Sequence, residues 1–152
     1  NTQKIHLSDA INEAIELLRA TEIQKNVKFV NKISGDLLVN ADPLMLRSIL
    51  QNIVTNAIKY SPRRGIVNLT AQLADNMTEV CVQDFGVGMT EKTKNTILGN
   101  ISIPSLPGTN QEQGTGLGLL LVKDFVAQHG GKIIIESKLR KGTCFKFTIT
   151  AN

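Results

Sequence analysis

The stretch ADPLMLRSILQNIVTNAIKYS, residues 41–61, predicts the central helix of the fold. Asp42 and Pro43 are typical of a helix start, because a side-chain cap is followed by proline at the first helical position. Pro62 indicates that the helix ends near Tyr60. Its apolar residues form one face, made of Leu46, Ile49, Leu50, Ile53, Val54 and Ala57. This face is expected to pack on the core.

A second stripe, of Asn52, Asn56 and Lys59, runs along the edge of that apolar face. Asparagine is a poor residue inside a helix, because its side chain competes for backbone hydrogen bonds. An edge asparagine taken alone is more often an ordinary polar residue. Two amides and an ammonium in line, however, offer donors and acceptors at a half-buried boundary, which suits a ligand.

The patterns on either side of this helix predict the rest of the fold. Upstream we expect a strand over 5–7, a helix capped by Ser8 that ends near 22–26, and strands over 27–33 and 37–41 around a turn. Downstream we expect strands over 66–74 and 78–84, helices over 91–98 and 117–129, and strands over 132–137 and 143–149. This mixture favours an α/β two-layer sandwich, in which a mixed, mostly antiparallel sheet of about five strands packs on three helices.

Composition indicates one soluble domain over residues 1–152, with 41% apolar and 20% charged residues. No apolar stretch approaches the roughly 20 residues that span a bilayer, and the polar opening NTQK predicts no signal peptide. The net charge of +4 is modest and scattered, which argues against nucleic-acid binding. Cys81 and Cys144 lack C-x-x-C spacing, so we expect reduced thiols in a reducing, cytoplasmic setting.

A long irregular stretch, residues 86–115, lies between two glycine-rich runs, DFGVGM at 84–89 and GTGLGL at 114–119. Loops longer than about 12 to 15 residues in compact domains are usually lids, binding loops or disorder. Glycines allow close backbone approach, and a glycine run that leads into a helix offers N–H groups to an anion. Either run alone is weak evidence, and GxGxG is not the dinucleotide-binding GxGxxG pattern.

In order and spacing, NIVTNAIKYS, DFGVGM, the loop and GTGLGL resemble the N, G1 and G2 boxes of the ATP-binding catalytic domain of sensor histidine kinases. That domain belongs to the GHKL superfamily, with gyrase, mismatch-repair and heat-shock chaperone ATPases. The resemblance covers nearly the whole chain and implies a Bergerat-type fold with a flexible ATP lid at about 89–115. It also implies that the cofactors are ATP and Mg²⁺.

The resemblance assigns roles to the polar stripe. Asn56 would coordinate Mg²⁺ at the phosphates, because an amide oxygen is a hard ligand. Lys59 would neutralise phosphate charge, with Asn52 and Tyr60 nearby. On this basis Asn56 and Lys59 are the candidate catalytic residues.

The resemblance also assigns the rest of the nucleotide site. Asp84 would accept a hydrogen bond from the adenine amino group, while Gly86 and Gly88 would let the backbone approach the base. Thr143 would help to hold the adenine side. The phosphates would be wrapped by the second glycine run, Gly114, Thr115, Gly116, Leu117, Gly118 and Leu119.

Two departures from the family pattern bear on function. Hydrolysing relatives commonly carry a glutamate four residues before the metal-binding asparagine, and here that residue is Asn52. A neutral amide cannot act as a general base, which favours phosphoryl transfer over fast hydrolysis. The lid also lacks the aromatic residue of the kinase F-box, so docking would rely on Ile97, Leu98, Ile101 or Ile103.

His6 and His129 are the two histidines of the chain, and neither is expected to accept the phosphoryl group. The resemblance therefore implies a fragment of a larger kinase that phosphorylates a histidine on a separate dimerisation domain in two-component signalling. Its partners would be that phosphotransfer domain and a downstream response regulator, with no nucleic acid and no membrane contact. The domain would be cytoplasmic even if the parent were anchored in the inner membrane. The alternatives are an anti-sigma-type serine kinase and a nucleotide-binding module without transfer.

Overall fold

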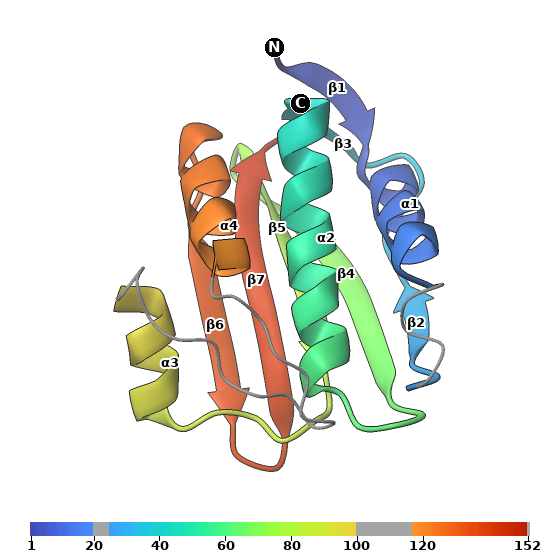
Figure 1. Ribbon diagram of the computed structural model, residues 1–152. Helices are drawn as coiled ribbons and strands as arrows, with labels where there is room; N and C mark the ends of the chain where they lie inside the picture. Colours follow the sequence, from blue (N-terminus) through green and yellow to red (C-terminus); the bar gives the residue numbers. More distant parts are fainter. Residues whose placement is uncertain (20–24, 100–116, 152) are drawn as a thin grey trace.

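The computed structural model describes residues 1–19, 25–99 and 117–151 as a two-layer α/β sandwich (Figure 1). A five-stranded sheet has the order β2-β4-β5-β7-β6. Its strands are β2 (Lys28–Asn31), β4 (Ile66–Ala74), β5 (Met77–Asp84), β6 (Ile133–Lys138) and β7 (Gly142–Thr150). One face carries α1 (Leu7–Arg19), α2 (Pro43–Tyr60) and α4 (Leu117–Gln128), while α3 (Glu91–Gly99) lies beside β6 at the edge. The predicted fold class is confirmed.

Helix α2 forms as its sequence predicts. Oδ1 of Asp42 accepts the N–H groups of Leu44 at 2.9 Å and Met45 at 3.1 Å, which satisfies two of the unpaired donors of the first turn. At the other end, the Ser61 N–H donates to the Ala57 carbonyl at 3.0 Å. All six residues of the predicted apolar face are at most 1% exposed. The helix therefore crosses the sheet as the centre of the core.

Strand β5 alternates cleanly between the two faces of the sheet. Its inward residues, Thr78, Val80, Val82 and Asp84, are buried against the helices. Val80 and Val82 belong to the hydrophobic core, whereas Asp84 is the last residue of the strand and pairs in register with Thr143 of β7. The register therefore places a carboxylate at the end of the sheet where α2 also ends.

The strands predicted around the turn at 34–36 both form, but they do not pair with each other. β3 (Leu38–Ala41) pairs antiparallel with β1 (Gln3–His6) in a separate two-stranded sheet. β2 instead pairs parallel with β4. Parallel neighbours need a long crossover, and here the connection that contains α2 supplies it.

The expectation of reduced thiols is wrong for this structure, in which Cys81 and Cys144 form a disulfide. The two residues lie on neighbouring strands, on the face of the sheet away from the helices, with a Cα–Cα distance of 6.2 Å. Spacing along the chain could not reveal this proximity, because the residues are 63 positions apart. The cysteines therefore give no support to a reducing compartment. Within the described ranges, no helix has both the length and the apolar character needed to cross a membrane.

Candidate functional site

Asp84 is the centre of the candidate site, because it is a fully buried carboxylate with one uncommitted oxygen. Its Oδ1 accepts the Gly86 N–H at 2.9 Å and the Thr143 N–H at 3.3 Å. Its Oδ2 is buried as well, yet no donor among the described residues reaches it. A buried acceptor without a partner is costly, so a ligand that donates a hydrogen bond there would remove that cost.

The charge of Asp84 is set by opposing effects. Burial raises the pKa of the carboxyl group to about 6, while the hydrogen bonds from Gly86 and Thr143 and the charge of Lys25 act to lower it. The group is therefore mostly ionised at neutral pH and can act as an acceptor. Burial, followed by the Asp84 charge, in turn raises the pKa of the nearby Tyr60 hydroxyl.

Close backbone contacts hold the first glycine run against its neighbours. A Cβ on Gly86 would lie 1.8 Å from the Tyr60 carbonyl oxygen, so the loop after β5 touches the end of α2 directly. A Cβ on Gly88, which has a φ of +70°, would lie 2.0 Å from the carbonyl oxygen of Lys138. Both predicted glycines are therefore required by packing, and they join three segments around Asp84.

The end of β6 and the start of β7 add two residues that sequence reasoning missed. The Ser137 Oγ accepts the Met89 N–H at 2.8 Å and lies 2.8 Å from the Thr143 hydroxyl. Gly142, at a φ of +106°, would place a Cβ only 2.2 Å from the Asp84 carbonyl oxygen. The sequence KGT at 141–143 is typical of a turn and could have indicated Gly142, whereas no local pattern indicated Ser137.

The polar stripe of α2 reaches the same end of the sheet, but its residues differ in their hydrogen bonds and their burial. The Asn52 amide donates to the Ser48 carbonyl at 2.7 Å, so its N–H group is used inside the helix. The half-buried Asn56 side chain makes no hydrogen bond to any described residue. Lys59 and Tyr60 are 8% and 9% exposed, and the Lys59 ammonium lies 5.3 Å from the Tyr60 ring centre.

Part of the predicted phosphate site lies outside the described residues, namely Gly114, Thr115 and Gly116. Leu117 and Gly118 begin α4, and Leu119 is half-buried and packs against the core. In the lid, Met89 is buried and belongs to the core, and α3 confirms the short predicted helix. Ile101 and Ile103 lie outside the described residues, as do the side chains of Ile97 and Leu98.

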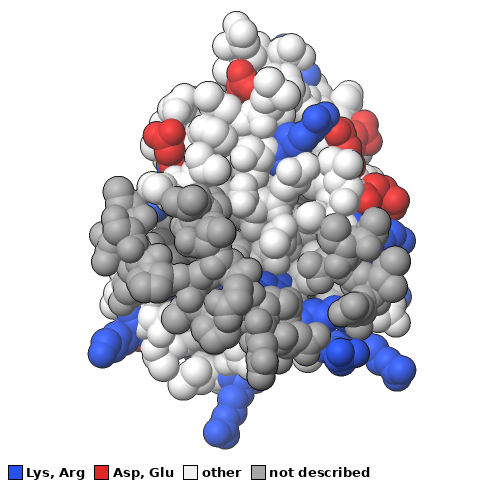
Figure 2. Space-filling view, viewed as in Figure 1, with Lys and Arg blue, Asp and Glu red and all other residues white. Residues whose placement is uncertain are grey.

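Basic side chains gather near this end of the molecule. Figure 2 shows protruding Lys and Arg side chains along the lower end of the displayed face, where α2 and β5 end, whereas its upper half carries Asp and Glu together with some Lys and Arg. The loop after α2 contains Arg63 and Arg64, and the end of β6 with its turn contains Lys138, Arg140 and Lys141. Such a distribution attracts a polyanion toward Asp84.

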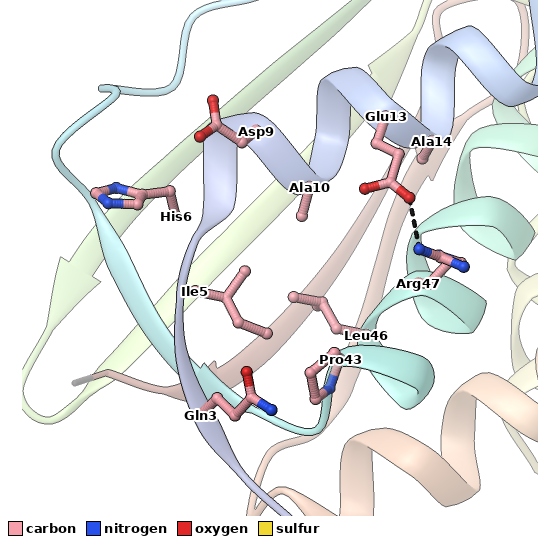
Figure 3. Close-up of a pocket in the computed structure, with 10 residues that line it drawn as sticks. All are labelled: Gln3, Ile5, His6, Asp9, Ala10, Glu13, Ala14, Pro43, Leu46 and Arg47. Atoms are coloured by element: carbon pink, nitrogen blue, oxygen red, sulfur yellow. Dashed lines mark hydrogen bonds and ion pairs between the residues drawn. The ribbon is translucent and has the colours of Figure 1, made fainter.

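A separate open pocket of about 280 Å³ lies at the opposite end of α2 (Figure 3). Ile5 and Leu46 point into it, and Glu13 pairs with Arg47 across its edge at 2.6 Å. Arg47 precedes Tyr60 by thirteen positions along the helix, which is a rise of about 20 Å. None of the predicted site residues lines this pocket.

The comparisons with known proteins agree on one family. Residues 41–152 match the family described as histidine kinase-, DNA gyrase B- and HSP90-like ATPase. Histidine protein kinase DivJ of Caulobacter vibrioides is 38% identical over 139 residues, which cover 89% of this chain and 23% of DivJ. The catalytic domain of histidine kinase ThkA has a TM-score of 0.81 at 27% identity, with 99% of this chain and 98% of that chain covered.

A structure of full-length ShkA in complex with AMPPNP also has a TM-score of 0.81, at 25% identity, and covers 100% of this chain and 32% of that chain. The chain spans less than half the length of the curated relatives it matches. With residues 41–152 matched and the fold shared, the chain belongs to the histidine kinase-, DNA gyrase B- and HSP90-like ATPase family, in which it resembles the catalytic domains of sensor histidine kinases.

Proposed function

We propose that this chain binds Mg-ATP and supplies the γ-phosphoryl group to a histidine on a separate dimerisation domain in two-component signalling. The observation that carries the proposal is the buried Oδ2 of Asp84, which lacks a donor among the described residues. The amino group of adenine is a donor of the required kind. The hydrogen bonds from Gly86 and Thr143 keep Oδ1 occupied and leave Oδ2 for the base.

The phosphate end of the proposed site begins on the last two turns of α2. The Asn56 amide is not engaged with a described side chain, so its oxygen could serve as a ligand for Mg²⁺. The bound ion would neutralise phosphate charge. Lys59 follows three residues later on the same stripe and would add a positive charge, and the arginines after α2 would draw the anion in. The residues present therefore fit Mg-ATP.

Phosphoryl transfer, rather than hydrolysis of ATP, is supported by the lack of a carboxylate on α2. The sequence from Pro43 to Tyr60 contains no Asp or Glu, and the Asn52 amide is bonded to the Ser48 carbonyl. No carboxylate on this helix can activate water. The phosphoryl group would then be retained for an acceptor that a partner domain presents and orients.

The histidines of the chain are poor acceptors for the phosphoryl group. The His129 Nε2 accepts the Asp42 N–H at 3.0 Å, and its Nδ1 lies 2.7 Å from the Phe125 carbonyl oxygen, so both ring nitrogens are engaged. His6 lies in the small sheet, where its Nδ1 is 3.0 Å from the Gly35 carbonyl oxygen. We therefore place the acceptor on another domain of the parent protein, which would pass the phosphoryl group to a response regulator in the cytoplasm.

Calorimetry with ATP and GTP, each with and without Mg²⁺, tests the proposal. We expect saturable ATP binding that Mg²⁺ strengthens, and weak GTP binding, because guanine presents a carbonyl where adenine presents its amino group. Absence of ATP binding would overturn the proposed function. Equal affinity for the two nucleotides would overturn the role of Asp84 while leaving nucleotide binding intact.

A further inference from the structure

Lys25 is the most deeply buried lysine of the described structure, at 2% exposure. Its ammonium donates to the carbonyl oxygens of Ile58 and Lys59, each at 2.7 Å. These carbonyls belong to the last turn of α2. A buried ammonium is rare unless it is paired, so its place here calls for a specific role.

The two contacts complete the C-terminal end of α2. The last four carbonyls of a helix have no partner within the helix, and a positive charge near them is also favoured by the helix dipole. The Ser61 N–H reaches the Ala57 carbonyl at 3.0 Å and the Ile58 carbonyl at 3.2 Å. The Lys25 ammonium donates a hydrogen bond to the Lys59 carbonyl and a further one to the Ile58 carbonyl, which the Ser61 N–H already reaches.

The main chain around Lys25 holds the next segment as well. The Lys25 carbonyl accepts the Arg64 N–H at 2.8 Å, and the Lys28 N–H donates to the Gly65 carbonyl at 2.9 Å. The residues that follow α2 are therefore tied to the start of β2. The Lys25 side chain and backbone together fix the end of the helix from which Lys59 and Tyr60 extend.

We propose that Lys25 is a positioning residue for the nucleotide site, acting through the last turn of α2. It fixes the backbone of Lys59, so that the Lys59 ammonium is positioned for phosphate. It also keeps the Tyr60 carbonyl against Gly86, next to Asp84. Its positive charge also favours the ionised form of Asp84, since it acts to lower the pKa of that carboxyl group. The inference rests on the proposed binding of ATP, although the fixing of α2 can be measured without nucleotide.

The test compares Lys25→Met and Lys25→Arg with Lys28→Met as the matched control. Lys28 has the same charge and an exposed side chain, and its main-chain bond to Gly65 survives the substitution. Amide hydrogen exchange, followed by NMR without nucleotide, reports the order of the last turn through Tyr60 and Ser61. In Lys25→Met we expect their protection to fall about tenfold or more, because charge-assisted hydrogen bonds are lost.

Affinity for ATP is measured on the same variants, at a temperature where each remains folded. We expect about tenfold weaker binding in Lys25→Met, partial recovery in Lys25→Arg and no change in Lys28→Met. Val39→Ala truncates a fully buried side chain of β3, in the small sheet, and supplies a control for lost stability. If Val39→Ala weakened ATP binding as much as Lys25→Met, the effect would be general destabilisation and the inference would fail.

The outcomes separate the two proposals. Unchanged ATP affinity in Lys25→Met, or unchanged protection at Tyr60 and Ser61, would overturn the role of Lys25. If the unsubstituted chain failed to bind ATP, the proposed function would fall and the positioning role with it. The exchange data would then still establish whether Lys25 fixes the end of α2.

Discussion

The Thr143 N–H donates to the Asp84 Oδ1 over 3.3 Å, although the two residues are 59 positions apart in the chain. This bond joins the start of β7 to the end of β5 and, with the Gly86 N–H, occupies one oxygen of a buried carboxylate. Two backbone donors on the same oxygen fix the orientation of the group. The other oxygen is thereby directed to a ligand, and its chemistry can be tested by substitution.

Replacing Asp84 by asparagine should separate binding from stability. The new side-chain amide would keep an oxygen for the N–H groups of Gly86 and Thr143 but would place an N–H₂ group where the adenine amino group needs an acceptor. We expect ATP affinity to fall about a hundredfold, and stability at pH 7 to be equal or higher because a buried charge is removed. Calorimetry and thermal unfolding measure both. An affinity equal to that of the unsubstituted protein would show that Asp84 does not contact the base.

Nucleotide affinity should depend on pH through the same carboxyl group. Because the pKa of Asp84 is about 6, the acceptor is lost as pH falls through 6, and affinity should decrease by up to tenfold per pH unit below that value. In Asp84→Asn this inflection should be absent. A profile that stays flat between pH 5 and 7, measured with the unsubstituted protein, would contradict an ionised acceptor.

The stability of the nucleotide-free protein is a second readout of the same titration, and it should change in the opposite sense. A carboxyl group whose pKa is raised by folding binds its proton more tightly in the folded state, so stability falls as pH rises from the unfolded value toward 6. Because folding raises the pKa of Asp84 from 3.8 to about 6, ionisation of this group lowers the unfolding free energy by about 3 kcal/mol once the pH is above 6. The difference in unfolding free energy between the unsubstituted protein and Asp84→Asn isolates it. A difference that is independent of pH from 4 to 7 would exclude a raised pKa.

Substitution of Asn56 by alanine should chiefly remove the effect of Mg²⁺. The Asn56 amide makes no bond to a described side chain, so little stability should be lost. We expect ATP binding without Mg²⁺ to change less than twofold, while the gain that Mg²⁺ provides and any phosphoryl transfer are lost. Thr55→Ala, at the exposed neighbouring position, is the matched control. Retention of the full Mg²⁺ effect in Asn56→Ala would place the ion elsewhere.

Local signals made most of the fold predictable. The Asp42–Pro43 start and the helical periodicity of α2 depend on residues a few positions apart, as does the alternation of β5. The glycine runs and Asp84 were identified through the order of three motifs. The sequence did not reveal Lys25, Ser137 and Gly142. Each of them contacts a segment that is distant in the sequence and comes close only in the folded structure. The disulfide and the partners of β2 and β3 were missed for the same reason.

The isolated domain should hydrolyse ATP very slowly. Asn52 stands where hydrolysing relatives commonly have glutamate, and its amide is bonded to the Ser48 carbonyl at 2.7 Å. At saturating ATP, Asn52→Ala should therefore leave the background hydrolysis rate unchanged within about twofold, since no general base is removed. Release of inorganic phosphate measures this directly. Rapid turnover by the unsubstituted domain, or a large loss of turnover in Asn52→Ala, would contradict the assignment to phosphoryl transfer.

Replacing Gly86 by alanine should disturb the contact between the loop after β5 and the end of α2. The new Cβ would lie 1.8 Å from the Tyr60 carbonyl oxygen, so one of the two backbone segments must move. We expect a loss of about 1 to 3 kcal/mol in unfolding free energy, together with weaker ATP binding, because the Gly86 N–H also orients Asp84. Gly35→Ala is the control, since a Cβ there meets no atom within 4 Å. If both variants matched the unsubstituted protein in stability and affinity, the close approach of Gly86 to Tyr60 could not be what shapes the site.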